Sequence, residues 1–224
     1  MFIKINKLFP LNKVWRKLSY KTSEFPYKEY NINNNCIFIH IPRNAGTSIL
    51  HMLGDNEGRL HRSYFDYLLS DDKRFKNYFK FAIVRNPYDR IVSVYEYLKN
   101  GGNKSHDLYF SEIIEKESGS FNWFINEFID EYRIHEVLLL KPQYLFLYDY
   151  KYELQVDYVG KFECLERDIL YICQKIKLPY KKIPKLNQSK KHSWQKYYEY
   201  NQTIEKVDRL YKKDFEFFGY DFMN

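Results

Sequence analysis

The stretch CIFIHIPRNAGTSILHML at residues 36–53 decides the fold. Its first six residues are mostly apolar and rich in β-branched types, which predicts a buried strand over residues 36–41. A turn of small residues follows, and the apolar run from Ser48 to Leu53 predicts a helix that ends near Gly54. A strand, a tight loop and the start of a helix, in this order, are typical of a phosphate-binding loop.

The loop differs from the loops of nucleoside triphosphatases in its cation. Those loops carry a lysine directly before the hydroxyl residue, whereas here Gly46 precedes Thr47 and Ser48, and the cation is Arg43 at the front of the loop. A helix amino terminus attracts an anion, a glycine lets the backbone approach it closely, and an arginine adds a forked charge. These features predict an anion site, and an ordinary strand-to-helix turn is the alternative.

A second strand end has similar features. FKFAIV at residues 79–84 predicts another buried strand, Arg85 follows it, and Asn86-Pro87 supplies an N-cap and a first-turn proline for a helix that contains Ser93. In an open parallel sheet, ligands lie beyond the carboxyl ends of the strands. We therefore expect both strand ends to face one crevice, bridged by a compound with two separate phosphates. The alternative is that Arg85 is a structural ion-pair partner.

Apolar strands that alternate with helices predict an α/β fold, a single P-loop-like domain with a central parallel sheet flanked by helices. We expect a basic amino-terminal lead-in over residues 1–30 and the domain over residues 31–224. The other expected elements are helices over roughly 63–72, from 87 to about 100, two within 107–132, one over 165–176 and a last one over 195–216, strands at 144–149 and 158–163, and a lysine-rich loop at 178–191.

The net charge of +7 is concentrated in two segments. Residues 1–28 hold seven Lys/Arg and one Glu, a charge of +6 that leaves the rest of the chain near +1, and residues 175–196 hold eight lysines and no acid. This distribution argues against a nucleic-acid partner, which favours a basic stripe across the fold. The basic lead-in is either simply solvated or weakly attracted to an anionic membrane surface.

Hydropathy and cysteine content bear on the compartment. The mean hydropathy is −0.63 and no apolar run approaches the length of a membrane-spanning helix. Three cysteines do not make a full disulfide set. The sequence therefore predicts a cytoplasmic protein, at most peripheral to a membrane, and leaves its oligomeric state open.

Two motifs carry a resemblance to a known family. IFIHIPRNAGTSI at 37–49 and VRNPYDRIVSVYEY at 84–97 resemble the two signature loops of the PAPS-dependent carbohydrate sulfotransferases, in particular bacterial relatives of the uronyl and heparan sulfate 2-O-sulfotransferases. VDYVGKFECLERDI, LNQSKKHSW and FEFFGYDF are also similar to bacterial members. The resemblance covers roughly residues 36–222, and the lack of a Golgi-type anchor favours a bacterial enzyme.

The resemblance implies a cofactor and its binding residues. In the family, the first loop holds the 5′-phosphosulfate end of PAPS (3′-phosphoadenosine 5′-phosphosulfate), and the second holds the 3′-phosphate through an arginine and a serine eight residues later, as in Arg85 and Ser93. Another loop, matched by Asn187, Ser189 and Lys190, closes over the nucleotide, and no metal is expected. The implied cofactor-binding residues are Arg43, Asn44, Ala45, Gly46, Thr47, Ser48, Arg85, Ser93, Ser189 and Lys190.

The implied reaction moves a sulfuryl group from PAPS to a hydroxyl of a carbohydrate acceptor, such as a cell-surface or capsular glycan. His61 lies in LHRSYFDY, which is similar to the His-x-Ser-Tyr-x-Asp stretch whose histidine is the family's base. Arg43 replaces the usual lysine and Asn44 the usual threonine; an arginine stays charged, so it can stabilise the leaving oxygen without donating a proton. Two alternatives remain: a non-catalytic anion- or glycan-binding module, and a P-loop kinase-like phosphotransferase.

Overall fold

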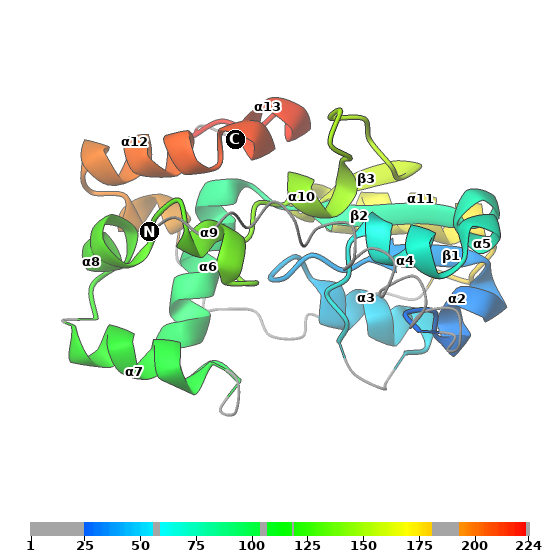
Figure 1. The fold of residues 1–224 in the computed structure, drawn as a ribbon, viewed down its shortest axis with the longest axis horizontal. Helices are drawn as coiled ribbons and strands as arrows, with labels where there is room; N and C mark the ends of the chain where they lie inside the picture. The colour runs from blue at the N-terminus through cyan, green and yellow to red at the C-terminus, as the bar shows by residue number, and fades with distance from the viewer. Residues whose placement is uncertain (1–24, 56–58, 104–106, 118, 181–192, 223–224) are drawn as a thin grey trace, which may run out of the picture.

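A three-stranded parallel sheet forms the centre of the fold in the computed structural model, which describes residues 25–55, 59–103, 107–117, 119–180 and 193–222 (Figure 1). The strands are β1 (Cys36–Ile39), β2 (Phe79–Val84) and β3 (Tyr158–Lys161), in the order β1-β2-β3. Cys36 pairs with Phe79 at the start of β1, and Val84 pairs with Lys161 at the end of β2. The predicted fold class is confirmed, and the carboxyl ends of all three strands lie at one edge of the sheet.

Helices surround this sheet. Their bounds are α2 (Glu29–Asn34), α3 (Gly46–Leu53), α4 (Tyr64–Ser70), α5 (Asp72–Asn77), α6 (Pro87–Lys99), α7 (Leu108–Lys116), α8 (Phe121–Trp123), the π-helix η2 (Phe124–Phe128), α9 (Arg133–Glu136), α10 (Tyr144–Leu147), the 3₁₀-helix η3 (Phe162–Cys164), α11 (Leu165–Ile176), the 3₁₀-helix η4 (Trp194–Tyr197), α12 (Asn201–Leu210) and α13 (Lys212–Phe218).

Both faces of the sheet are covered, because β1 is apolar on both sides and β2 is apolar except for the buried Lys80. Side chains of β1 that point to one face pack with residues of α4, α5, α10 and α13, and those on the other face pack with residues of α3 and α11. On the first face lie Ile37, Ile39, Ala82, Val84, Tyr67, Phe75, Phe146 and Phe218; on the second lie Cys36, Phe38, Phe81, Ile83, Ile49, Leu50, Ile169 and Ile172.

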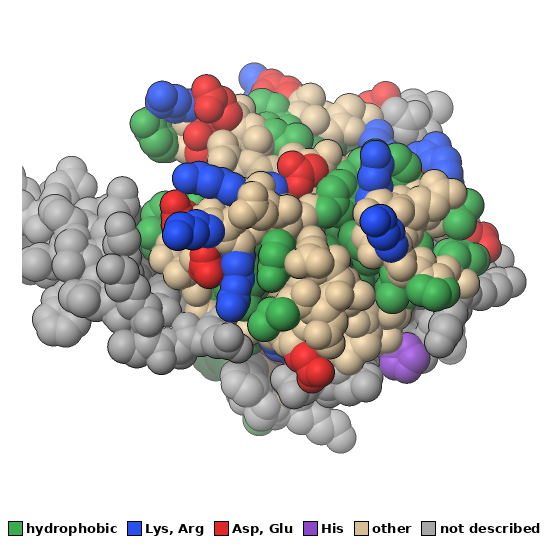
Figure 2. Space-filling model, turned by 90° about the vertical axis from the view of Figure 1, so that its right-hand side faces the viewer, with side chains coloured by type: hydrophobic (Ala, Val, Ile, Leu, Met, Phe, Trp, Pro, Cys, Tyr) green, Lys and Arg blue, Asp and Glu red, His purple; other side chains and the backbone are tan. Residues whose placement is uncertain are grey.

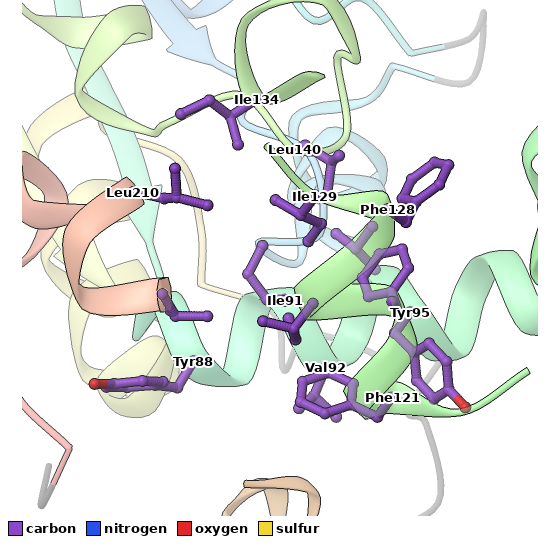
Figure 3. Packing of buried hydrophobic residues seen from close by; sticks show 14 of the residues in the cluster. Tyr88, Ile91, Val92, Tyr95, Phe121, Phe128, Ile129, Ile134, Leu140 and Leu210 are labelled. Carbon is purple, nitrogen blue, oxygen red and sulfur yellow. The ribbon is translucent and has the colours of Figure 1, made fainter. Parts of the chain in front are cut away.

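A third core forms beside the sheet around α6 (Figure 3). Ile91 and Tyr95 of α6 pack with Phe121 and Phe128, and Leu210 of α12 belongs to the same cluster. The start of α6 is fixed as predicted, because the side chain of its N-cap, Asn86, accepts a hydrogen bond from the N–H of residue 88 at 3.0 Å. The direction of α6 at the end of β2 is therefore fixed, and Asp89 and Ser93 in its first two turns lie near the carboxyl edge of the sheet.

The predicted strand at 144–149 is wrong. Residues Tyr144–Leu147 form α10, and only a single antiparallel bridge between Tyr148 and Leu154 follows. The aromatic and branched residues of this segment favour a strand locally. Asp214 overrides that preference, because its carboxylate accepts the N–H groups at the start of α10.

Two predicted helices are divided and two predicted strands are shorter. The helix expected over 63–72 breaks at Asp71, whose side chain caps α5 by accepting two backbone N–H groups. The helix expected over 195–216 comprises η4, α12 and α13, with a break at Tyr211, whose hydroxyl donates to the carbonyl of Leu140 at 2.7 Å. The strand expected over 158–163 ends at Lys161, where η3 begins, and the strand expected over 36–41 ends at Ile39.

The amino-terminal end of the sheet is covered by segments close to the predicted lead-in. Tyr27 is buried, and its hydroxyl donates to the carbonyls of Tyr67 and Asp71 at 3.2 and 3.1 Å. α2 and α5, which precede β1 and β2, lie at the right of Figure 1, and Figure 2 views that side, where cationic and anionic side chains are interspersed. The basic residues before position 25, expected to be either solvated or weakly attracted to an anionic membrane surface, lie outside the described residues. Within the described part of the chain, no helix has the length and apolar character needed to cross a bilayer.

Candidate active site

The loop between β1 and α3 has an unusual backbone. Arg43 and Ala45 both adopt the left-handed region, with φ of 69° and 60°. Non-glycine residues there cost about 1 kcal/mol or more and persist where the surroundings hold them, most often at functional sites. The carbonyl of Ala45 accepts hydrogen bonds from the N–H groups of Ser48 and Ile49 at 3.0 and 3.2 Å, so the loop passes directly into the first turn of α3.

Gly46 is required for a reason that the sequence did not reveal. A Cβ atom at this position would lie 1.7 Å from His40 Nε2, so no side chain fits without displacing the histidine ring. His40 is buried and stacks on Phe38, with ring centroids 5.5 Å apart. The absence of a side chain at Gly46 therefore leaves room for the imidazole ring of His40. The sequence pattern had indicated a different reason for this glycine, the close approach of an anion.

Arg43 is a largely buried cation at the front of this loop. Its Nε and Nη2 atoms donate to Ser93 Oγ at 3.1 and 3.0 Å, and its guanidinium lies over the ring of Tyr97, 4.5 Å from the centroid. Burial, together with the nearby charge of Arg85, lowers the pKa of Arg43 to about 10, so the guanidinium remains charged at neutral pH. The packing on Tyr97 and Ser93 holds the fork in one orientation.

Arg85 lies directly after β2 and reaches the first loop. Its Nη1 donates to the carbonyl of Arg43 at 3.1 Å, its Nε pairs with Asp89 at 2.7 Å, and its guanidinium lies 4.2 Å from the ring centroid of Phe162. Ser93, expected to accompany Arg85, is held by Arg43. The structure thus brings Arg43, Arg85 and Ser93 together at one edge of the sheet and links the two predicted phosphate loops directly.

The other predicted residues of the first loop differ in whether their side chains are buried or partly exposed to solvent. Asn44 is buried, and its Nδ2 donates to the carbonyl of Ile83 at 2.8 Å and to Gln143 Oε1 at 2.7 Å, so its side chain ties the loop to the sheet. Ser48 is also buried, whereas Thr47 is partly exposed. Ser189 and Lys190 lie outside the described residues.

His61 is attached to the end of β1 by one hydrogen bond. Its Nδ1 lies 2.9 Å from the main-chain carbonyl oxygen of His40, and the two imidazole rings are 4.1 Å apart between centroids. Because a carbonyl oxygen only accepts, Nδ1 carries the proton and Nε2 keeps its lone pair. Burial lowers the pKa of His61, with the charge of Arg59 adding to the effect and the bond to His40 opposing it, so the ring is neutral at pH 7. This is the tautomer and charge state that a general base needs.

The segment that contains His61 is itself well ordered. Ser63 caps α4, and its N–H and hydroxyl both donate to Asp66 Oδ2 at 3.0 Å. The Ser and Asp of the His-x-Ser-Tyr-x-Asp stretch thus form a capping box, which sets the start of the helix. Ser63 and Asp66 therefore help to fix the backbone near His61, which lies two residues before Ser63.

Residues near the carboxyl terminus, together with Glu163, support Asn86 at the start of the second loop. Glu163 accepts the N–H of Asn86 at 2.7 Å and the hydroxyl of Tyr220 at 2.8 Å, and Asn86 Nδ2 donates to the carbonyl of Asp221 at 3.1 Å. The FEFFGYDF ending, at first only part of a resemblance, thus supports the start of α6. Sequence reasoning missed the roles of Tyr97, Asp89, Phe162 and Gln143, since none of them shows a local signal of ligand binding.

Two other features bear on where a ligand could bind. A cavity of about 420 Å³ lies between α9, α10, α12 and α13, is lined by residues such as His135, Arg209 and Lys213, and includes none of the predicted site residues. Among the described residues, no group of three or more His, Cys, Asp and Glu side chains could hold a metal ion.

Comparison with known proteins identifies the family. The sulfotransferase family profile matches residues 30–221. Carbohydrate sulfotransferase 11 of Mus musculus is 27% identical over 173 residues, which is 67% of this chain and 49% of that protein, and its Rattus norvegicus counterpart is 26% identical over the same shares. An uncharacterized protein of Archaeoglobus fulgidus is 35% identical over 108 residues, 48% of this chain and 74% of that protein.

The chain spans about half the length of the curated carbohydrate sulfotransferases that it matches. No solved structure matches it at a significant level. Because the family profile covers nearly all of the described residues, together with both loops and His61, the chain belongs to the sulfotransferase family.

Proposed function

We propose that this chain transfers a sulfuryl group from PAPS to a hydroxyl of a carbohydrate. The observation that carries the proposal is the direct link between the two loops, in which Arg85 Nη1 donates to the carbonyl of Arg43 while Arg43 holds Ser93. A donor with phosphate groups at both ends fits a site in which two arginines from two strand ends meet. Membership of the sulfotransferase family and the likeness to proteins named carbohydrate sulfotransferases support the same reaction.

The residues divide between the two ends of the donor. Arg43, with the positive end of the α3 dipole and the hydroxyls of Thr47 and Ser48, would hold the 5′-phosphosulfate. Arg85 and Ser93 would hold the 3′-phosphate, and Ser189 and Lys190 would cover the nucleotide. PAPS supplies an activated sulfuryl group and a phosphate leaving group.

His61 is the base in this proposal. Its Nε2 takes the proton of the acceptor hydroxyl as the hydroxyl oxygen forms a bond to sulfur, and the bond from sulfur to the 5′-phosphate oxygen breaks. The neutral state follows from burial, and the free Nε2 follows from the hydrogen bond of Nδ1 to His40. A base placed in this way contributes about 10²–10⁴ in rate.

Arg43 stabilises the charge that grows on the leaving phosphate oxygen. Its guanidinium keeps its proton, so the leaving oxygen departs as an anion paired with Arg43. The chemistry parallels phosphoryl transfer, in which positioning and positive charge provide most of the catalysis. Two guanidinium groups and a helix amino terminus supply that charge, so the proposal needs no metal.

A non-catalytic anion- or glycan-binding protein on the same fold is the second candidate, and the replacement of the usual lysine by Arg43 favours it. Titration with PAP and with ATP·Mg, followed by transfer assays with labelled PAPS on a panel of neutral and acidic polysaccharides, separates the possibilities. Binding of PAP with label transfer supports the proposal. Binding of PAP with no transfer to any polysaccharide favours the non-catalytic module, and preference for ATP·Mg favours a kinase-like phosphotransferase.

A further inference from the structure

The side chain of Gln143 lies outside every motif, yet it contacts both loops. Its Oε1 accepts from Asn44 Nδ2 at 2.7 Å and from the N–H of Arg85 at 2.9 Å, and its Nε2 donates to the carbonyl of Arg85 at 2.9 Å. Gln143 is fully buried. A single carboxamide therefore ties the loop after β1 to the residue after β2.

The bonds to Arg85 replace strand pairing where the sheet ends. β2 ends at Val84, and the next residue, Arg85, has both its N–H and its C=O paired with the amide of Gln143. Two residues of neighbouring antiparallel strands exchange the same pair of bonds. The side chain of Gln143 thus extends the hydrogen bonding of β2 by one residue, which fixes the backbone from which the Arg85 guanidinium projects.

Gln143 is in turn held by buried charges on two helices. Asp214 of α13 accepts the N–H groups of Gln143 and Tyr144 at 2.8 and 2.9 Å. Arg90 of α6 donates to the main-chain carbonyls of residues 139–141. Both charged side chains have no exposed surface. The segment that presents Gln143 is therefore clamped on both sides and has little freedom to follow the loops if they move.

We infer that Gln143 is a positioning residue that sets the distance between the two arginines of the donor site. The inference rests on the proposed function, since it assumes that Arg43 and Arg85 hold the two ends of PAPS. Arg85 Nη1 donates to the carbonyl of Arg43, so a shift of the Arg85 backbone moves both groups. A misplacement of about 1 Å in such a site can cost about 10²-fold in rate.

The test replaces Gln143 by methionine, which keeps the length of the side chain and removes all three hydrogen bonds. The matched control is Asn31→Leu. Asn31 is an equally buried carboxamide at the opposite end of the sheet, where it accepts the N–H of Lys28 at 2.8 Å and donates to the carbonyl of Cys36 at 2.9 Å. Calorimetry with PAP, KM for PAPS, kcat and Tm are measured for both variants and the parent.

We expect both variants to lower Tm and only Gln143→Met to weaken PAP binding, by about tenfold or more, with a matching rise in KM for PAPS. If Gln143→Met does not fold, Gln143→Asn serves instead: it keeps the carboxamide but is one methylene too short to reach both loops, and the same weakening is expected.

Three outcomes overturn the inference. A folded Gln143 variant that binds PAP within about twofold of the parent shows that the loops hold their own spacing. An equal loss of PAP affinity in Asn31→Leu shows that general destabilisation is the cause. A parent protein that does not bind PAP refutes the proposed function as well, whereas the first two outcomes leave the proposed function intact.

Discussion

Two buried carboxamides at opposite ends of the sheet make different kinds of bonds. Asn31, before the amino end of β1, bonds to groups three and five residues away. Gln143, at the carboxyl edge, bonds to Asn44 and Arg85, which are 99 and 58 residues away. The same chemical group closes a local turn at one end and joins distant segments at the other.

The difference suits the two ends of the sheet to different tasks: the amino end stabilises the fold, and the carboxyl edge holds the residues of the proposed site. The bonds of Asn31 join groups close together in the chain, whereas the bonds of Gln143 join the loop after β1 and the residue after β2 to the N-cap of α10, segments that meet only in the folded sheet. The carboxyl edge also holds the two linked arginines and two left-handed residues, Arg43 and Ala45, in the loop itself, whereas the left-handed Asn35 at the amino end is the C-cap of α2. We therefore expect substitutions at the carboxyl edge to change binding and turnover, and substitutions at the amino end to change stability alone.

The largest effect is expected for His61→Ala. Removal of the base should lower kcat by about 10²–10⁴ and leave PAP affinity nearly unchanged, because Nε2 faces the acceptor in the proposed reaction. Steady-state kinetics with labelled PAPS and calorimetry with PAP measure the two quantities. Near-full turnover with the true acceptor would show that another residue is the base.

Substitution of Arg43 tests whether charge at the leaving oxygen matters. We expect Arg43→Ala to lose about 10²–10³ in kcat, the usual loss for one transition-state donor. Arg43→Lys should keep or raise turnover, since a compact ammonium restores the family's usual group and can also give up a proton. Comparison of kcat for the three forms, with PAP affinity alongside, decides the point: an Arg43→Ala variant as fast as the parent would reduce the loop to a nucleotide cradle.

Arg85→Ala should weaken PAP binding by about thirtyfold, or about 2 kcal/mol, because a charge-assisted phosphate contact is lost. The variant also loses the bond to the carbonyl of Arg43, so kcat is expected to fall as well. Lys76→Ala, an exposed cation in α5 near the amino end of the sheet, is the matched control and should leave both quantities unchanged. Unchanged PAP affinity in Arg85→Ala contradicts the assignment of the 3′-phosphate site.

Acid should destabilise the protein through the two histidines at the end of β1. Burial lowers the pKa of His40 well below its usual value of 6.5, and burial also lowers the pKa of His61. The unfolded chain therefore binds protons that the folded chain does not, so this contribution to stability is present above about pH 6.5 and is lost as the pH falls. The limiting slope is about 1.4 kcal/mol per pH unit for each histidine.

Denaturant unfolding between pH 7.5 and 5 measures this slope. His40→Asn should reduce it, whereas the exposed His51 offers a control, His51→Asn, that should leave it unchanged. A slope that is the same in His40→Asn and in the parent would show that other groups control the acid limb.

Local signals in the sequence were sufficient to predict the central strands and the start of α6. The β-branched run at 36–41 and the apolar run at 79–84 identified the first two strands, and Asn86 with Pro87 identified the start of α6. These predictions succeeded because burial on both faces and helix capping depend on residues that are adjacent in the chain. The residues that meet at the carboxyl edge, Arg43, Arg85 and Ser93, followed from the rule that ligands lie beyond parallel strand ends.

Only the tertiary structure decided how those residues are held. The segment at 144–149 favours a strand by its composition, but the carboxylate of Asp214, 70 residues away, begins a helical turn there. Gly46 is needed because His40 occupies the space beneath it, Ser93 serves Arg43, and Gln143 joins the two loops. Gly46 and His40 are close in the chain, but their steric contact depends on how the loop folds over the end of β1. The other contacts pair groups at least 50 residues apart, whose hydrogen-bonding needs are met only when the sheet and its helices have packed, so no local pattern of residues could specify them.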